Sequence, residues 1–335
     1  MKITKNNNID NQFQEVLNQI NEAKHNSYKA INKTLIELYS NIGEYISDKI
    51  NNNLWGKSIV EELANYIKKE APDAKGYGER NLWRMKQFYE IYRNNEKLSP
   101  LVTELSWTNN LIIISGTKTE SERAFYINLA IKERLSKREL ERQLSTGVYE
   151  RTILANQSLS KTVKNLPQNT KNVFKDSYIV DFLDIPSKHS EKDLQKALVS
   201  SLKDFILEIG KDFAFLGQEY RLQVGDSDFY IDLLFYHREL QCLVAFELKI
   251  DKFKPAYLGQ LEFYLEALDK DIRKDYENPS IGILLCHKKD DKVVEYALNR
   301  SISPTVIAEY ETKLIPKEIL KKKVNELFEM YESTK

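Results

Sequence analysis

Apolar positions in the first half of the chain recur at a spacing of three or four residues, which is typical of helices. Val16, Ile20, Leu35 and Leu38 belong to the longest such run. Proline and glycine at 72, 76 and 78 interrupt the pattern after the second run. The expected helices are 12–52, a helix from a Ser58 cap to about Lys69, a helix ending near Tyr92, and helices around 120–131 and 136–147.

The helix that ends near Tyr92 has two different faces. One face is apolar, and the other carries Arg80, Arg84 and Gln87, with Lys86 nearby. Together with the preceding helix, this outline resembles a helix–turn–helix whose second helix contacts nucleic acid, although the connecting turn is longer than usual. The alternative is a helical hairpin whose arginines are solvated. Arg80, Arg84 and Lys86 are therefore candidate nucleic-acid-binding residues.

The pattern changes in the second half, where short apolar or alternating runs predict strands between helices. The helix EKDLQKALVSSLKDFILEIG begins after Ser190, which is expected to cap it, and stops at Gly210. The resulting order, α-β-β-β-α-β-α-β-α, predicts an α/β domain with a mixed sheet. The expected strands are 215–224, 228–237, 242–250, 280–286 and 305–310, and the later helices are 255–269, 290–299 and 316–332.

Residues 151–180 are rich in Asn, Ser, Thr and Lys and have weak periodicity. Such a segment is typical of a linker between domains. The chain is therefore expected to divide into a helical domain over 1–150, a linker over 151–180, and an α/β domain over 181–335.

Composition places the chain among globular proteins, since 41% of its residues are hydrophobic and 30% are charged. The sequence contains no apolar run long enough to span a bilayer and no signal-peptide core, so we expect a cytoplasmic protein without membrane contact. Cys242 and Cys286 can form a disulfide in principle, but two reduced, buried thiols fit this compartment better.

The charge is divided unevenly, although the net charge is zero. Lys and Arg outnumber Asp and Glu over residues 1–175, and the reverse holds over 176–335. A basic half suits contact with a polyanion, and an acidic half suits the binding of cations. Ordinary variation in surface charge is the alternative interpretation.

Three charged residues interrupt the apolar strands at 228–237 and 242–250, namely Asp232, Glu247 and Lys249. Alternation along a strand puts Glu247 and Lys249 on one face. If residues 238–241 form a four-residue hairpin loop, Asp232 lies directly opposite Glu247. Two facing carboxylates repel each other, and a divalent cation between them removes the repulsion.

These three side chains together have a coherent chemistry. The carboxylates can hold Mg²⁺, which polarises a phosphate oxygen and lowers the pKa of a bound water. A lysine on the same face can orient that water or stabilise charge that develops at phosphorus. The alternative is a structural ion pair between Lys249 and either acid at a sheet edge.

The same residues resemble the PD-(D/E)xK nuclease superfamily and, more narrowly, the bacterial YhcG-like family. The resemblance lies in YIDLLFYH…CLVAFELK, in KPAYLGQLEFYLEAL and in NPSIGILLCHKKDDKVVEYAL. The first half is similar to the uncharacterised N-terminal domain of that family through WGKSIVEELA, KGYGERNLWRMKQFY, ELSWTNN and LSKRELERQL. The resemblance covers nearly the whole chain and implies a restriction-endonuclease-like fold for the second half.

The resemblance also implies roles for single residues. Asp232 corresponds to the metal-binding aspartate of the superfamily, while Glu247 and Lys249 correspond to its second acid and its lysine. The carbonyl group of Leu248 would be a further metal ligand. The proline in the name of the motif is replaced by Ile231, which is a common departure.

Many members of the superfamily add an acid from the first helix of the domain. Glu191 is the candidate, Asp193 is the alternative, and Gln195 occupies a neighbouring turn where a carboxylate would also serve. Some subfamilies carry Gln-x-x-x-Tyr after the lysine strand, which corresponds to Gln260 and Tyr264. This spacing puts both side chains on one helical face, within reach of a phosphate or base. A partly buried tyrosine on an amphipathic helix is the alternative.

The combined expectation is a nuclease that hydrolyses phosphodiester bonds, most simply in DNA, with Mg²⁺ as cofactor and Mn²⁺ as a substitute. The long N-terminal helices and the helix EILKKKVNELFEMY suggest a homodimer. The resemblance adds a link to mobile elements, restriction or phage defence. The alternative function is a non-catalytic module that binds nucleic acid or protein on a nuclease-like fold.

Overall fold

The computed structural model describes residues 3–95, 97–155, 158–165, 173–186, 188–299 and 301–333. The chain divides into two compact units, Met1–Glu141 and Arg142–Lys335. The expectation of a mostly helical region followed by a mixed-sheet α/β domain is confirmed. Within the described residues, no helix combines the length and the apolar composition that a membrane-spanning segment requires.

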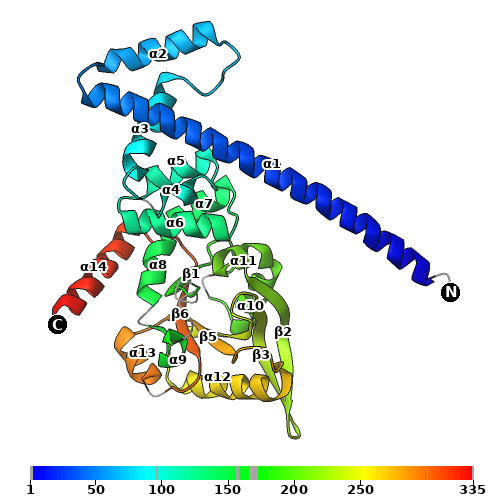
Figure 1. Cartoon of the computed structure of the whole chain (residues 1–335). Helices are drawn as coiled ribbons and strands as arrows, with labels where there is room; N and C mark the ends of the chain where they lie inside the picture. The colour runs from blue at the N-terminus through cyan, green and yellow to red at the C-terminus, as the bar shows by residue number, and fades with distance from the viewer. Residues whose placement is uncertain are drawn as a thin grey trace. The chain divides into compact units, whose positions relative to one another are not determined.

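The first unit is built from helices (Figure 1). The helix expected from Ser58 instead starts one residue earlier, and Gly56 occupies the N-cap position without a side-chain hydrogen bond. The prediction that Ser58 caps this helix is therefore wrong. The helices of this part of the chain are α1 (Ile3–Asn51), α2 (Lys57–Glu70), α3 (Glu79–Tyr92), α4 (Ser99–Val102), α5 (Trp107–Gly116), α6 (Glu120–Lys132) and α7 (Lys137–Ser145), which continues into the second unit.

Helices α1 and α3 approach each other closely at Gly43. A Cβ atom at this position would lie 2.1 Å from the backbone oxygen of Met85, so only glycine allows this packing. Leu82 and Met85 of α3 and Ile46 of α1 are fully buried at this contact. The interior of the first unit is thus formed mainly by the later part of α1 and by its neighbours.

The earlier part of α1 has no such cover. Phe13, Val16, Leu17 and Ile20 form an apolar stripe on this stretch, and each is between 46% and 67% exposed. Figure 1 shows this stretch (blue) as a continuous helix that extends beyond the other helices of its unit. The apolar stripe of α1, defined by these four residues, is therefore largely exposed.

A six-stranded sheet forms the centre of the second unit, in the order β1-β6-β5-β4-β3-β2. The pairs β2–β3 and β3–β4 are antiparallel, and the other three pairs are parallel, so the sheet is mixed as expected. The strands are β1 (Ser177–Ile179), β2 (Phe213–Val224), β3 (Ser227–His237), β4 (Cys242–Lys252), β5 (Ile281–Lys288) and β6 (Thr305–Glu311).

Both faces of the sheet are covered by helices. One core contains Leu194 and Phe205 from α10 and α11, packed on alternate side chains of the strands, and the other contains Leu261 and Val294 from α12 and α13. Apolar runs on both faces explain why these strands are nearly continuously hydrophobic. The bounds are α10 (Glu191–Ser200), α11 (Leu202–Ile209), α12 (Ala256–Ala267), a π-helical turn over Leu268–Ile272, and α13 (Asp291–Leu298).

Residues 151–180 differ from the expected linker. Helix α8 (Val148–Ala155) packs through Leu154 on α14 (Lys317–Ser333), and β1 pairs with β6 inside the sheet. Helix α9 (Lys161–Lys164) and β1 are too short to show a period, which is why the sequence looks irregular here. The described residues of this segment are therefore part of the second unit. Residues 156–157 and 166–172 of the predicted linker lie outside the described residues.

Candidate active site

The hairpin of β3 and β4 sets the geometry of Asp232, Glu247 and Lys249. Its pairs run from His237–Cys242 to Leu233–Phe246, which confirms the predicted register and the four-residue loop over 238–241. In this loop Gln241 has a left-handed backbone (φ 48°), and the ring of His237 accepts a hydrogen bond from a loop amide. Continuing the register by one residue brings the Asp232 position opposite Glu247.

Asp232 lies where the regular strand pairing ends. Its carboxylate oxygen Oδ2 accepts a hydrogen bond of 2.8 Å from the backbone N–H of Leu248. Burial raises the pKa of Asp232, and the nearby carboxylates of Glu191 and Glu219 add to this effect. The Leu248 amide and the Lys249 ammonium act in the opposite direction without cancelling the shift. Negative charge is therefore in excess around Asp232.

Glu247 is almost completely buried, with 2% of its surface exposed. Its oxygen Oε1 accepts a hydrogen bond of 2.8 Å from Lys249, while Oε2 has no protein partner. Burial and the charge of Asp232 raise the pKa of Glu247 to about 7, despite the bond from Lys249. The single positive charge of Lys249 therefore does not balance the charges of both Asp232 and Glu247.

Lys249 lies between two carboxylates. Its Nζ is 2.8 Å from Oε1 of Glu247 and 3.4 Å from Oε2 of Glu191, and 5.5 Å from the ring centre of Tyr257. Burial lowers the pKa of Lys249, but the bond to Glu247 and the surrounding negative charges outweigh burial and raise it. The lysine therefore carries its positive charge at neutral pH.

Helix α10 decides which additional acid reaches the site. Glu191 contacts Lys249, whereas Asp193 is used in a capping box with Ser190 and holds the start of the helix. Gln195 is buried and donates from Nε2 to the backbone oxygen of Asp232 over 2.8 Å. The structure thus brings Glu191 to the site and not Asp193. In the sequence, only its position four residues after Glu191 on the same helix indicated that Gln195 would lie near the site.

Gln260 and Tyr264 lie on one face of α12, as the spacing predicted. Nε2 of Gln260 donates to the hydroxyl of Tyr264 over 2.8 Å. Burial raises the pKa of Tyr264, and the charges of Glu247 and Asp232 contribute, so the phenol lies near the two acids. Gln260 is exposed and Tyr264 is 5% exposed. Contact of either residue with a substrate stays a prediction.

The donor atoms suit a hard cation that brings its own water and phosphate ligands. Among the described residues, there is no group of three or more His, Cys, Asp or Glu side chains that could hold an ion by themselves. Mg²⁺ is commonly bound through one or two carboxylates, with the remaining ligands from water and substrate. The oxygen Oε2 of Glu247, buried and without a partner beside Asp232, fits such an ion.

The basic residues predicted on α3 are separated by the fold. Arg80 and Arg84 line a shallow hollow together with Trp83. Lys86 points elsewhere, since its Nζ is 2.6 Å from Glu90 and its side chain is only 16% exposed. Arg80 and Arg84 thus share this hollow with the acidic Glu79, and Lys86 is already paired, so contact of the two arginines with nucleic acid stays a prediction.

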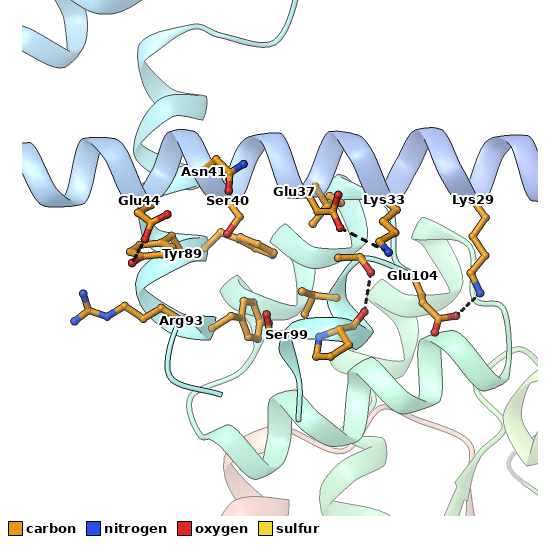
Figure 2. A pocket seen from close by; sticks show the side chains of 16 residues that line it. Lys29, Lys33, Glu37, Ser40, Asn41, Glu44, Tyr89, Arg93, Ser99 and Glu104 are labelled. Atoms are coloured by element: carbon orange, nitrogen blue, oxygen red, sulfur yellow. Dashed lines mark hydrogen bonds and ion pairs between the residues drawn. The ribbon is translucent and has the colours of Figure 1, made fainter. Parts of the chain in front are cut away.

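A second hollow of the first unit, between α1, α3 and α4, has a volume of about 690 Å³ (Figure 2). Figure 2 shows Lys29 beside Glu104 and Lys33 beside Glu37, whereas Arg93 points away from the labelled carboxylates. Lys29 is 3.0 Å from Glu104, and Lys33 is 3.8 Å from Glu37. Both lysines are therefore already paired, and Arg93 is a further cation that lines this hollow.

Comparison with protein families finds two matches that together cover most of the chain. Residues 171–325 match the model of the YhcG PDDEXK nuclease domain, and residues 15–151 match the model of the DUF1016 N-terminal domain. A protein of Escherichia coli (strain K12), described as "Putative nuclease YhcG", is 28% identical over 336 residues, covering 89% of each chain.

Two solved structures resemble part of the chain. One is a repair endonuclease from Pyrococcus abyssi, with 16% identity and a TM-score of 0.26, and the other is an EndoMS–dsDNA complex, with 18% identity and a TM-score of 0.27. Each covers 39% of this chain, which in turn spans about half the length of those chains.

Proposed function

We propose that this chain, which belongs to the family joining a DUF1016 N-terminal domain to a YhcG PDDEXK nuclease domain, hydrolyses phosphodiester bonds with the help of a divalent cation. One observation carries the proposal. The carboxylate of Glu247 is buried beside Asp232, and one of its oxygens has no protein partner. Lys249 bonds to Glu247 but has to balance the charge of Asp232 as well, and a bound cation would supply the missing positive charge.

Asp232 and Glu247 would hold Mg²⁺, with Mn²⁺ as a substitute, and the carbonyl of Leu248 and the side chain of Glu191 would complete the protein's share of ligands. When bound, such an ion polarises a phosphate oxygen and lowers the pKa of a water. Lys249 stays protonated because three acids surround it, so it can donate to a phosphate oxygen that gains charge. The bonds to Glu247 and Glu191 keep its Nζ in place.

We propose DNA as the substrate, held partly by Arg80 and Arg84 of the first unit. Both line the same hollow of α3, and each phosphate contact makes affinity more sensitive to salt. Gln260 is proposed to contact a phosphate or base from its exposed position on α12. We also propose action in the cytoplasm, which is supported by the free, buried cysteines Cys242 and Cys286, and keep the link to mobile elements or phage defence as a prediction.

A cleavage assay with the full chain tests the proposal on single- and double-stranded DNA and RNA, with and without Mg²⁺. Asp232→Asn removes a proposed ligand, and Lys249→Met removes the proposed donor. We expect each to lower the rate at least ~100-fold, because both act on charge at the reacting phosphate. Asp228→Asn is the matched control, since Asp228 lies on the same strand and forms an exposed pair with Arg221.

The control variant should cleave like the wild type, and a chelator should stop cleavage. If wild type, Asp232→Asn and Lys249→Met behave alike on every substrate, the catalytic proposal is wrong. In that case, nucleic-acid binding measured on the same samples would support the alternative of a non-catalytic binding module.

We propose in addition that the chain forms a homodimer through the apolar stripe of α1. The apolar side of α14 is already used, because Leu320, Val324 and Leu327 pack with α8. The stripe of α1 is exposed, and it lies on a helix of 49 residues that a second copy could pair with. We expect sedimentation of the wild type at micromolar concentration to give a dimer, and Leu17→Glu to give a monomer.

Leu54→Glu serves as the control for the dimer, because Leu54 is 61% exposed but lies outside the stripe. It should leave the dimer intact. A wild-type chain that sediments as a monomer would remove this proposal without affecting the nuclease.

A further inference from the structure

Asp232 lies at a break in the pairing between β3 and β4. The last pair is Leu233–Phe246, one residue short of Asp232. Beyond it, the backbone N–H of Leu248 donates a hydrogen bond to the side chain of Asp232. The carboxylate of Asp232 thus links β3 to β4 at the point where the regular pairing of the two strands ends.

The pairing is also interrupted on the other side of Asp232. Gln218 and Tyr220 of β2 both have partners on β3, but the residue between them, Glu219, has a left-handed backbone with φ 44°. Backbone pairing between β2 and β3 is interrupted at the position where Glu219 and Asp232 would face each other. Irregular backbone of this kind in a strand re-aims side chains and is frequent beside active sites.

Gln195 occupies the place where a strand partner is missing. Its Nε2 donates to the backbone oxygen of Asp232 over 2.8 Å, and the side chain is 5% exposed. Because it lies one helical turn after Glu191 on α10, one rigid helix carries both residues to the site. The backbone oxygen of Asp232 therefore accepts its hydrogen bond from a helix side chain, where a regular sheet would supply an amide of the neighbouring strand.

We propose that Gln195 is a positioning residue for metal binding, which keeps the backbone of Asp232 away from β4 so that its carboxylate stays opposite Glu247. A buried carbonyl without a partner is costly, so the oxygen of Asp232 would otherwise bond to an amide of β4. That bond would close the break in the sheet and turn the carboxylate away from the Leu248 N–H. The inference rests on the proposed function, because it concerns the same site.

Binding of Mn²⁺ to the full chain without substrate tests this proposal, measured by the electron paramagnetic resonance signal of free Mn²⁺. The half-saturating Mg²⁺ concentration for cleavage is a second measurement. We expect Gln195→Met to raise the dissociation constant for Mn²⁺ about 10- to 100-fold, the usual effect of losing a group that orients a ligand. Gln195→Asn keeps a buried amide but withdraws it by one methylene, so it should weaken binding while causing less disturbance to folding.

The chain contains a matched control in Gln143. This glutamine is also buried and donates from Nε2 to a backbone oxygen, that of Leu207, over 3.1 Å. Gln143→Met should lose comparable stability in a thermal unfolding experiment but keep Mn²⁺ affinity within about twofold, because it does not touch a proposed ligand.

The outcomes separate this inference from the proposed function. If the wild type binds no Mn²⁺, the proposed metal site itself is wrong. If the wild type binds Mn²⁺ and Gln195→Met and Gln195→Asn bind it equally well, only the positioning role is overturned. Equal weakening by Gln143→Met would also overturn it, since the effect would then come from general loosening of the unit.

Discussion

Glu208 and Glu247 are both buried glutamates of the second unit, and their surroundings differ. The carboxylate of Glu208 is 2.5 Å from Arg151 and accepts a hydrogen bond from the backbone N–H of Ile179. Burial alone would raise the pKa of Glu208, but Arg151, Lys175 and the Ile179 amide outweigh burial and lower it. This glutamate is therefore ionised and fully compensated by the fold.

Glu247 has the opposite balance. Its one direct cation is Lys249, and a second acid, Asp232, lies close by. Burial and Asp232 raise its pKa to about 7. Both glutamates have an Oε2 atom without a partner, so an unpaired oxygen alone does not distinguish a site from a structural cluster. The neighbouring charges do, because Arg151 and Lys175 both lie beside Glu208, whereas Glu247 is bonded to Lys249 and lies next to a second acid.

The largest effect on stability is expected at the compensated cluster. Arg151 is completely buried, so Arg151→Met would leave Glu208 as a buried charge with only the more distant Lys175. We expect a loss of about 3–5 kcal/mol in the free energy of unfolding, measured by urea denaturation. Arg142→Met is the matched control, because Arg142 forms a 2.6 Å pair with Asp181 that is partly exposed.

The control should lose no more than about 1 kcal/mol. Replacing both partners, in Arg151→Met with Glu208→Met, should restore part of the stability, since the buried carboxylate is removed while Lys175 loses its 3.8 Å partner. If Arg151→Met and Arg142→Met lose equal amounts of free energy of unfolding, the buried cluster stabilises the chain no more than a partly exposed pair does. The contrast between Glu208 and Glu247 would then be wrong.

A smaller effect should appear in the pH dependence of stability. The pKa of Glu247 is raised from 4.5 to about 7, so the folded chain binds this proton more tightly than the unfolded chain. The contribution of Glu247 to the free energy of unfolding should therefore fall as pH rises from about 4.5 to about 7, by on the order of 3 kcal/mol. Glu247→Gln should remove most of this slope in urea denaturation at the two pH values, and added Mn²⁺ should restore stability to the wild type only.

Glu266→Gln provides the reference for that experiment, since Glu266 forms an exposed pair with Lys270. The free energy of unfolding of Glu266→Gln should depend on pH as that of the wild type does. If the free energy of unfolding of the wild type rises relative to that of Glu247→Gln between pH 4.5 and pH 7, the pKa of Glu247 is not raised, and the proposed lack of positive charge beside it is wrong.

The smallest effects are expected in the first unit, where the same contrast recurs on α3. Lys86 is neutralised by Glu90, as Glu208 is by Arg151, whereas Arg80 and Arg84 face a hollow. Arg84→Ala should weaken DNA binding and reduce the slope of log affinity against log salt concentration by about 1, the change expected when one phosphate contact is lost. Lys86→Ala should leave both the affinity and this slope nearly unchanged. Titrations at several salt concentrations measure both, and equal losses would show that the pairing of Lys86 does not limit its use.

Much of the candidate site followed from strand periodicity and the length of one loop. Alternation put Glu247 and Lys249 on one face, and the four residues between His237 and Cys242 set the register that brings Asp232 opposite Glu247. These relations are local, because a strand has a period of two and a short hairpin admits few registers. The strands β2 to β6 and most of the helices were predictable for the same reason.

Contacts between distant segments were not predictable in this way. Helix α10 precedes β3 by more than ten residues, and only its packing on the sheet selects Glu191 over Asp193 and brings Gln195 to the backbone of Asp232. The same holds for β1, whose three residues become a strand because β6 offers them a partner. The polar composition around β1 suggested a linker, since a single short pairing leaves no periodic pattern.

The sequence by itself therefore determined most of the elements, the faces of the strands and the identity of the three charged residues within the hairpin strands, because these depend on neighbours a few residues away. Only the tertiary structure decided which buried charges are compensated. Glu208 and Glu247 both lie in apolar surroundings in the sequence, and the difference between them comes from Arg151 and Lys175, which the fold brings from other elements to one glutamate and not to the other.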